Sequence, residues 1–216
     1  MPETKLQSLL EIFNDRFFRI PDYQRGYSWT EDQLEDFWHD LEILADDGKH
    51  YTGLLTVEEV SIDKAKGDSA RWVDDMWRFS NGYKAFYVVD GQQRLTTVII
   101  LIKVLLDKFE GATINTRPKD EMTRKFLYQE EATVSYVFGY ERDNPSDEFF
   151  KTRIMGRNSA AAANVPETLY TMNLEKARDY FSKKLQGLEQ DKLARLFKKL
   201  SLGLMFNFYQ IDTDLA

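Results

Sequence analysis

Two short polar strings in this sequence could do chemistry on a phosphate group. The more informative one is Asp90-Gly91-Gln92-Gln93-Arg94, which lies where a strand-forming segment gives way to a helix-forming one. Free backbone N–H groups and the helix dipole favour an anion at such a junction, and Gly91 lets the backbone approach a ligand closely. Arg94 would add a forked donor for phosphate oxygens. Asp90 could hold Mg²⁺ or orient a water, and the Gln92 and Gln93 amides could position that water or read a base edge.

The other string is Tyr23-Gln24-Arg25, within a segment that contains Pro and Gly and therefore cannot be continuous helix. Each string adjoins the end of a predicted strand, so we predict that both face one shared pocket. A structural interpretation stays open for each: Asp90 could simply cap the following helix, and the Tyr23 string could be a packed, hydrogen-bonded loop. Neither string matches a P-loop, and no glycine-rich nucleotide fingerprint occurs elsewhere.

The elements around these strings follow from the spacing of apolar residues. Arg16–Ile20 is predicted to be a strand leading into the first string. Tyr51–Val60 and Ala85–Val89 are predicted strands on either side of a long polar connection at 61–82, as in a hairpin. From Gln92 onward, apolar residues recur at the i, i+3, i+4 spacing of a helix. Further helices are predicted over 4–14 with Thr4 as a possible cap, from Thr30 onward, and over 120–131, 146–155, 167–186 and 189–200, with a loop at 156–166 and a last strand at 204–211.

Composition limits the class of protein. The chain has 216 residues, of which 43% are hydrophobic, enough for one substantial core or a small domain with a second lobe. It has no cysteine and two histidines, which excludes disulfides, cysteine nucleophiles and histidine-rich metal sites and fits a reducing cytosol. The net charge of −7 argues against unaided DNA binding except through a local patch. No signal peptide or membrane-spanning stretch is expected, so we predict a cytoplasmic protein without membrane contacts.

Charged and aromatic residues outside the two strings are interpreted mainly as structural. The helix that Thr30 opens is rich in Asp and Glu and is read as a solvated acidic face, with a metal site as the alternative. The basic clusters Lys198-Lys199 and Arg117-Lys119-Arg124-Lys125 are read as solvated helix faces, with phosphate contacts as the alternative. Trp38 is assigned to the core, whereas Trp29 and Tyr27 could instead stack on a base.

The order of these segments resembles a known family. IPDYQRGYSW, an acidic amphipathic helix, YTGLLTV and VVDGQQRLTTVIILI resemble the N-terminal DGQQR-motif domain of restriction and phage-defence proteins of the GmrSD and SspE type. The resemblance is strong over 12–109 and loose over 140–212. It implies an α+β fold, in which a small mixed ParB/sulfiredoxin-like sheet with flanking helices is followed by a mainly helical lobe. The expected division is a DGQQR-motif domain at 1–110 and a helical lobe at 111–216. We expect the helical lobe to be truncated at its C-terminal end, because a later Asn-Arg-Gly motif of the family is absent.

The resemblance also implies a function, namely a nucleotide-binding and NTP-hydrolysing regulatory domain of a restriction system directed at modified phage DNA. Its implied partners are a nucleoside triphosphate, DNA through the full-length protein, and a nuclease domain or subunit that holds the cleavage chemistry. Mg²⁺ is the implied cofactor, with Asp90 as its ligand. Gly53 stands at the position of a family glycine. The implied catalytic residues are Asp90, Gln93, Arg94 and Gln24, and the implied nucleotide-binding residues are Tyr23, Gln24, Arg25, Gly91, Gln92, Arg94 and Thr97.

Two other functions remain open at this stage. The same polar pocket could sense modified DNA without hydrolysing an NTP. Alternatively, the domain could be an interaction module whose acidic helix binds a nuclease partner. Salt dependence separates the two, because DNA binding weakens steeply with salt and a partner module need not bind DNA.

Overall fold

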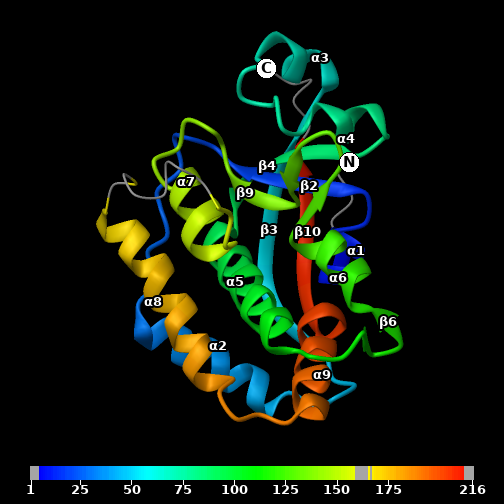
Figure 1. The fold of residues 1–216 in the computed structure, drawn as a ribbon, viewed down its shortest axis with the longest axis vertical. Coiled ribbons are helices and arrows are strands. Elements are labelled where there is room, and N and C mark those ends of the chain that lie inside the picture. The colour runs from blue at the N-terminus through cyan, green and yellow to red at the C-terminus, as the bar shows by residue number, and fades with distance from the viewer. Residues whose placement is uncertain (1–4, 159–164, 166, 212–216) are drawn as a thin grey trace.

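The computed structural model describes residues 5–158, 165 and 167–211. Its main feature is a six-stranded mixed sheet with the strand order β1-β10-β3-β4-β2-β9 (Figure 1). β4 pairs in parallel with β2 and antiparallel with β3, while β10 runs parallel to β3. The strands of this sheet are β1 (Lys5–Ser8), β2 (Arg16–Ile20), β3 (His50–Val60), β4 (Lys84–Asp90), β9 (Phe138–Tyr140) and β10 (Leu204–Ile211). Two small antiparallel pairs are β5 (Thr113–Ile114) with β6 (Arg117–Pro118) and β7 (Tyr128–Glu130) with β8 (Val134–Tyr136).

Helix α5 (Gln92–Lys108) is the centre of the helical layer. Its side chains are buried on nearly every side, which is the pattern of a helix enclosed by protein. In Figure 1 it runs between the sheet and the outer helix α8, and it also contacts α6 and α9. The other helices are α1 (Leu9–Ile12), α2 (Glu31–Ile43), α3 (Ile62–Gly67), α4 (Met76–Ser80), α6 (Lys119–Phe126), α7 (Asp147–Phe149), α8 (Leu169–Lys184) and α9 (Gln190–Lys198), with π-helical turns η1 (Phe150–Ile154) and η3 (Lys199–Gly203).

Both faces of strand β2 are covered, because successive side chains of a strand point to opposite faces. Phe17 makes edge-to-face contacts with Trp72 and Phe79, which come from the connection between β3 and β4. Phe18 packs edge-to-face against Phe13, which follows α1. All of these rings except that of Phe79 are buried in the core. β2 is therefore held firmly along its length, which fixes the point where it ends and the first polar string begins.

The predicted fold class is confirmed, since the chain forms a mixed sheet with flanking helices and becomes mainly helical toward its C-terminus. β2 has the predicted bounds, Thr30 is the N-cap of α2, and β3 and β4 form the expected antiparallel pair. The two segments predicted as domains share the sheet, because β9 and β10 come from the second of them. In the described part of the chain, no helix has the length and apolar character needed to cross a bilayer.

The helix predicted over 4–14 is wrong for its first half. Lys5–Ser8 is a strand that pairs antiparallel with β10, and only Leu9–Ile12 is helical. The edge of β10 offers backbone hydrogen bonds that local helix propensity cannot anticipate. Thr4 lies outside the described residues.

Three smaller differences concern the later part of the chain. The helix predicted over 120–131 ends at Phe126 and is followed by the strand β7. The polar connection at 61–82 contains two short helices, α3 and α4, which were not predicted. Most of the predicted loop at 156–166 lies outside the described residues, and 156–158 and 165 are neither helix nor strand.

Candidate functional site

The two polar strings meet at one edge of the sheet. Because β2 and β4 are neighbouring parallel strands, their carboxyl ends lie side by side, and this is where open α/β sheets commonly hold ligands. The string after β2 and the string after β4 border one cavity of about 280 Å³. The residues that line it are Gln24, Arg25, Trp29, Val89, Asp90, Gly91, Gln92, Gln93 and Arg94.

The turn at Gly91 directs the start of α5 toward this cavity. Gly91 is the N-cap residue and has a left-handed backbone with φ 89°, a conformation that glycine adopts without strain. A Cβ atom at this position would also lie 2.7 Å from the carbonyl oxygen of Leu54. No side chain caps the helix, so Asp90 is not a helix cap. The N–H groups of the first turn of α5 are therefore available to a ligand.

The glutamines of both strings tie the first string to the second. The Gln24 Nε2 donates to the carbonyl oxygen of Val89 at 3.0 Å. The Gln92 Nε2 donates to the Arg25 carbonyl oxygen at 3.2 Å and to Gln24 Oε1 at 3.3 Å. Gln93 uses both ends of its amide, since Nε2 donates to the Gly26 carbonyl oxygen and Oε1 accepts from the backbone N–H that follows Tyr27. The amides thus hold the loop in place, and Gln92 Oε1 is left buried without a partner.

Residues outside the strings support the loop from behind. The hydroxyl groups of Tyr27 and Thr97 are hydrogen-bonded at 2.7 Å. The Asn173 Nδ2 on α8 donates to the Tyr27 carbonyl oxygen at 3.4 Å. A Cβ on Gly26 would lie 2.4 Å from the ring of Tyr170, so α8 packs directly against this backbone. The α8 residues were missed from the sequence, because nothing local marks a contact between such distant segments.

Three charged side chains at the cavity have no partner within the described protein. Arg25, Asp90 and Arg94 are exposed, and none of their side chains forms a hydrogen bond or ion pair with a described residue. The Arg94 guanidinium lies over Gly53, where a Cβ would be 2.9 Å from its Nη1. Gly53 has φ 134°, which few side-chain-bearing residues adopt. Two cationic forks and one carboxylate are therefore free to bind a ligand.

Two of the predicted site residues do not line the cavity. Thr97 is buried behind the loop, where its hydroxyl bonds Tyr27 and also donates to the Gln93 carbonyl oxygen at 2.8 Å. Tyr23 is 69% exposed and is not among the residues that line the cavity. Partial burial, reinforced by nearby carboxylates, raises the pKa of the Tyr23 hydroxyl above its ordinary value. The other predicted residues come together as expected.

Asp90 is the carboxylate available to a metal at this cavity. In the described segments, no group of three or more His, Cys, Asp or Glu side chains could hold a metal ion. Mg²⁺ is usually bound by one or two carboxylates together with water and substrate phosphates, not by an all-protein cage. A single unpartnered carboxylate beside two arginines fits Mg²⁺ that arrives with a phosphate ligand.

The fold and the cavity define an α+β domain with a polar, cationic cavity at the carboxyl ends of two parallel strands. The family model described as the GmrSD restriction endonuclease N-terminal domain matches residues 9–215 of this chain. The chain therefore belongs to that family and is a component of a restriction system. No protein in the curated set matches it.

Proposed function

We propose that this domain binds a nucleoside triphosphate and hydrolyses it slowly, as the regulatory part of a cytoplasmic restriction system directed at modified phage DNA. The observation that carries the proposal is the convergence of two unpaired guanidinium groups and an uncapped helix N-terminus on one cavity. Arginine forks and helix N-termini are the two protein groups best suited to phosphate oxygens. DNA and a nuclease domain or subunit are the proposed partners.

The proposed mechanism depends on charge and position. Arg94 and Arg25 bind the phosphate oxygens and offset the negative charge that builds up as the terminal P–O bond breaks. Asp90 accepts a hydrogen bond from the attacking water and orients it toward the terminal phosphorus. Asp90 would hold Mg²⁺, which would supply further neutralisation of the phosphate charge. Gln24 and Gln93 are catalytic residues that the family resemblance implies, and we propose that they act by holding the loop that carries Arg25.

Trp29 supports a place for the nucleoside. It is half-buried and lines both the site cavity and a neighbouring cavity of about 430 Å³ between α2 and α8. Aromatic rings provide stacking surfaces for bases without requiring a particular sequence. With the phosphates at Arg94 and Arg25, the nucleoside would extend past Trp29 into this second cavity.

The first test is calorimetric titration of the chain with ATP, GTP, CTP and UTP, with and without Mg²⁺, together with an assay of phosphate release. We expect one class of nucleotide to bind at a single site. Asp90→Asn should keep binding but lower the hydrolysis rate about 100-fold, the lower range for losing a positioned acid–base group. Asp36→Asn is the matched control, because Asp36 is an exposed carboxylate on α2 away from the cavity. Absence of nucleotide binding, combined with salt-sensitive binding of modified DNA at the same residues, would replace the proposal with a DNA sensor.

A second prediction concerns Gly53→Ala. The new methyl group would displace the Arg94 guanidinium and would sit on a backbone with φ 134°. We expect nucleotide affinity to fall about threefold to tenfold, equivalent to roughly 0.7–1.4 kcal/mol, and stability to fall by about 1–3 kcal/mol from backbone strain. Denaturant unfolding and calorimetry measure the two effects. Gly67→Ala is the control, since a Cβ there meets no other atom within 4 Å, and equal effects at both glycines would contradict the contact with Arg94.

A further inference from the structure

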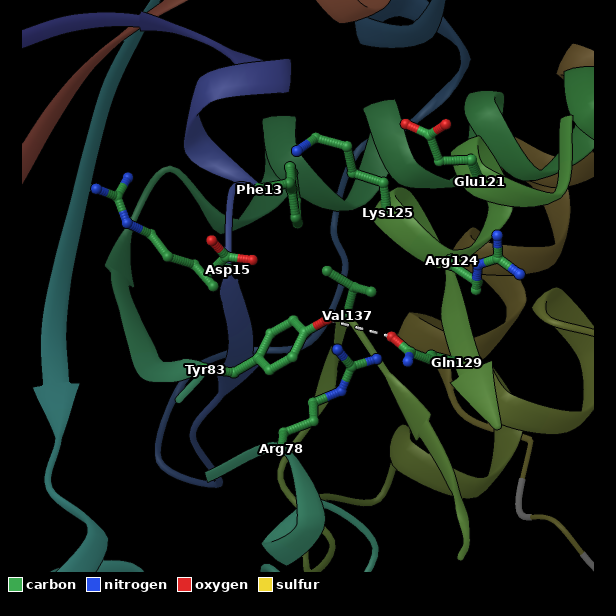
Figure 2. A pocket seen from close by; sticks show the side chains of 10 residues that line it. Phe13, Asp15, Arg78, Tyr83, Glu121, Arg124, Lys125, Gln129 and Val137 are labelled. Carbon is green, nitrogen blue, oxygen red and sulfur yellow. Dashed lines mark hydrogen bonds between the residues drawn. The ribbon is translucent and has the colours of Figure 1, made fainter. Parts of the chain in front are cut away.

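A second charged cavity lies at the opposite end of the parallel strands. It has a volume of about 270 Å³ and is bordered by residues that begin or precede β2, β4 and β9, whereas the candidate site lies where β2 and β4 end (Figure 2). Its floor contains the apolar side chains of Phe13 and Val137. The polar and charged residues around it are Asp15, Arg16, Arg78, Tyr83, Glu121, Arg124, Lys125 and Gln129. Four of these side chains are cationic and two are carboxylates, so the cavity is positive in a protein whose net charge is −7.

Three of the four cations that border this cavity bond to neutral oxygen atoms, whereas Arg124 forms an ion pair with Asp120 at 3.1 Å. Arg78 is 1% exposed, and it donates from Nε to Ser135 Oγ at 2.6 Å and from Nη2 to the Ser135 carbonyl oxygen at 3.0 Å. Lys125 donates from Nζ to Asn14 Oδ1 at 3.2 Å. Neither forms an ion pair with a carboxylate of the described chain. Figure 2 shows the Arg78 guanidinium and the Lys125 side chain on two sides of the space that Tyr83, Gln129 and Asp15 also border.

The carboxylate nearest Arg78 is already engaged. Asp75 Oδ1 forms an ion pair with Arg19 at 2.6 Å and also accepts a hydrogen bond from Ser135 Oγ. Arg19, Arg78 and Asp75 are all buried, and Asp75 pairs directly with Arg19 but is linked to Arg78 only through the Ser135 hydroxyl. A buried charge without a counter-charge is costly, and the usual remedies are a paired ion or a bound ligand. The excess positive charge adjoins the cavity through Arg78.

The titration behaviour of these groups agrees with that charge excess. Burial, together with the neighbouring Arg19, lowers the pKa of Arg78 to about 10. Burial also lowers the pKa of Lys125 and of Arg16. In each case burial removes solvent from the charged form, and the nearby carboxylates offset this loss only in part. An anion within the cavity would supply the missing stabilisation.

We propose that this second cavity binds a phosphate group, held by Arg78 and Lys125 with the Tyr83 hydroxyl as a further donor. The Tyr83 hydroxyl now donates to Gln129 Oε1 over a long 3.4 Å and could turn to a closer acceptor. The group would belong either to a small phosphate compound or to the backbone of DNA. This site is distinct from the nucleotide site proposed above and does not depend on it.

Asp15 provides the sharpest test, because its carboxylate faces the same cavity and would oppose an anion. Asp15 has φ 53°, a left-handed conformation that Asn also tolerates, so Asp15→Asn removes the charge and should keep the fold. We expect Asp15→Asn to tighten phosphate binding at least about threefold. Lys125→Gln should weaken it at least about fivefold. Lys66→Gln, at an exposed lysine of α3, is the control for net charge.

The experiment is a titration with inorganic phosphate and pyrophosphate followed by NMR, performed in an Arg94→Ala background that weakens binding at the first site. Chemical-shift changes should localise to the Gln129 and Val137 amides. The affinity obtained from them should be highest for Asp15→Asn, intermediate for the parent protein and lowest for Lys125→Gln. A second arm compares a short DNA duplex with the same duplex carrying uncharged methylphosphonate linkages. Binding of the charged duplex alone, lost in Lys125→Gln, assigns the site to backbone phosphate, whereas binding of pyrophosphate assigns it to a small compound. The proposal is overturned if neither ligand binds, or if Asp15→Asn and Lys125→Gln leave the affinity unchanged.

Discussion

Replacing Arg94 with alanine is expected to lower nucleotide affinity at least about tenfold while the free energy of unfolding stays unchanged. The guanidinium is exposed and has no hydrogen-bond or ion-pair partner among the described residues, so its removal breaks no internal bond of that kind. A charge-assisted hydrogen bond to a ligand is worth roughly 1.5–3 kcal/mol, and about 1.4 kcal/mol corresponds to a tenfold change in affinity. Calorimetric titration with the preferred nucleotide and denaturant unfolding give the two quantities.

Two further variants make this result specific. Arg94→Lys keeps the charge but loses the fork that binds two oxygens, so its affinity should fall between those of the parent and Arg94→Ala. Arg195→Ala removes another exposed arginine, on α9, and should leave affinity unchanged. Unchanged nucleotide affinity in a folded Arg94→Ala variant would remove Arg94 from the site, and a loss of stability would show that its contact over Gly53 is structural.

The sequence predicted the parts of this fold that depend on local pattern. β2 has the predicted bounds because its apolar residues are flanked by turn-forming ones, and α5 follows from a long, regular apolar spacing. The predicted helix at 4–14 failed because Lys5–Ser8 gains its hydrogen bonds from β10, at the far end of the chain. Tertiary pairing of this kind overrides a weak local preference and leaves no trace in the segment itself.

The candidate site shows the same limit at the level of side chains. Turn chemistry and residue type sufficed to predict that the strings at Gln24 and Asp90 share a pocket. Which atom each glutamine contacts could not be predicted, because the partners are backbone carbonyls placed by the turn geometry, as for Gln93 and Gly26. The second cavity likewise could not be predicted as a site from the sequence, although Arg124 and Lys125 were recognised as part of a basic cluster. Its lining is drawn from separate segments that only the folded sheet and helix α6 bring together.

This chain is expected not to cleave DNA by itself, even with metal ions and nucleotide present. Phosphodiester hydrolysis usually requires a metal cluster or a histidine base. His39 is exposed on α2, and His50 lies 3.5 Å from one carboxylate, that of Asp40. Across the described residues, no set of three potential metal ligands comes together, and this includes the acidic helix α2. The proposed nucleotide site has Asp90 as its carboxylate, which suits a triphosphate better than a duplex held between two metals.

The measurement is incubation of the purified chain with modified and unmodified phage DNA, Mg²⁺ or Mn²⁺, and each nucleoside triphosphate, followed by gel analysis for nicks. We expect intact DNA under all conditions over a time in which nucleotide is hydrolysed. The net charge of −7 adds to this expectation, because unaided capture of a duplex depends on neutralising its phosphates. Any nicking must be traced with Asp90→Asn, since contaminating nucleases are unaffected by that change. Nicking that is lost in Asp90→Asn but retained in Asp36→Asn would place the nuclease chemistry in this domain. The proposed division between regulation and cleavage would then be wrong.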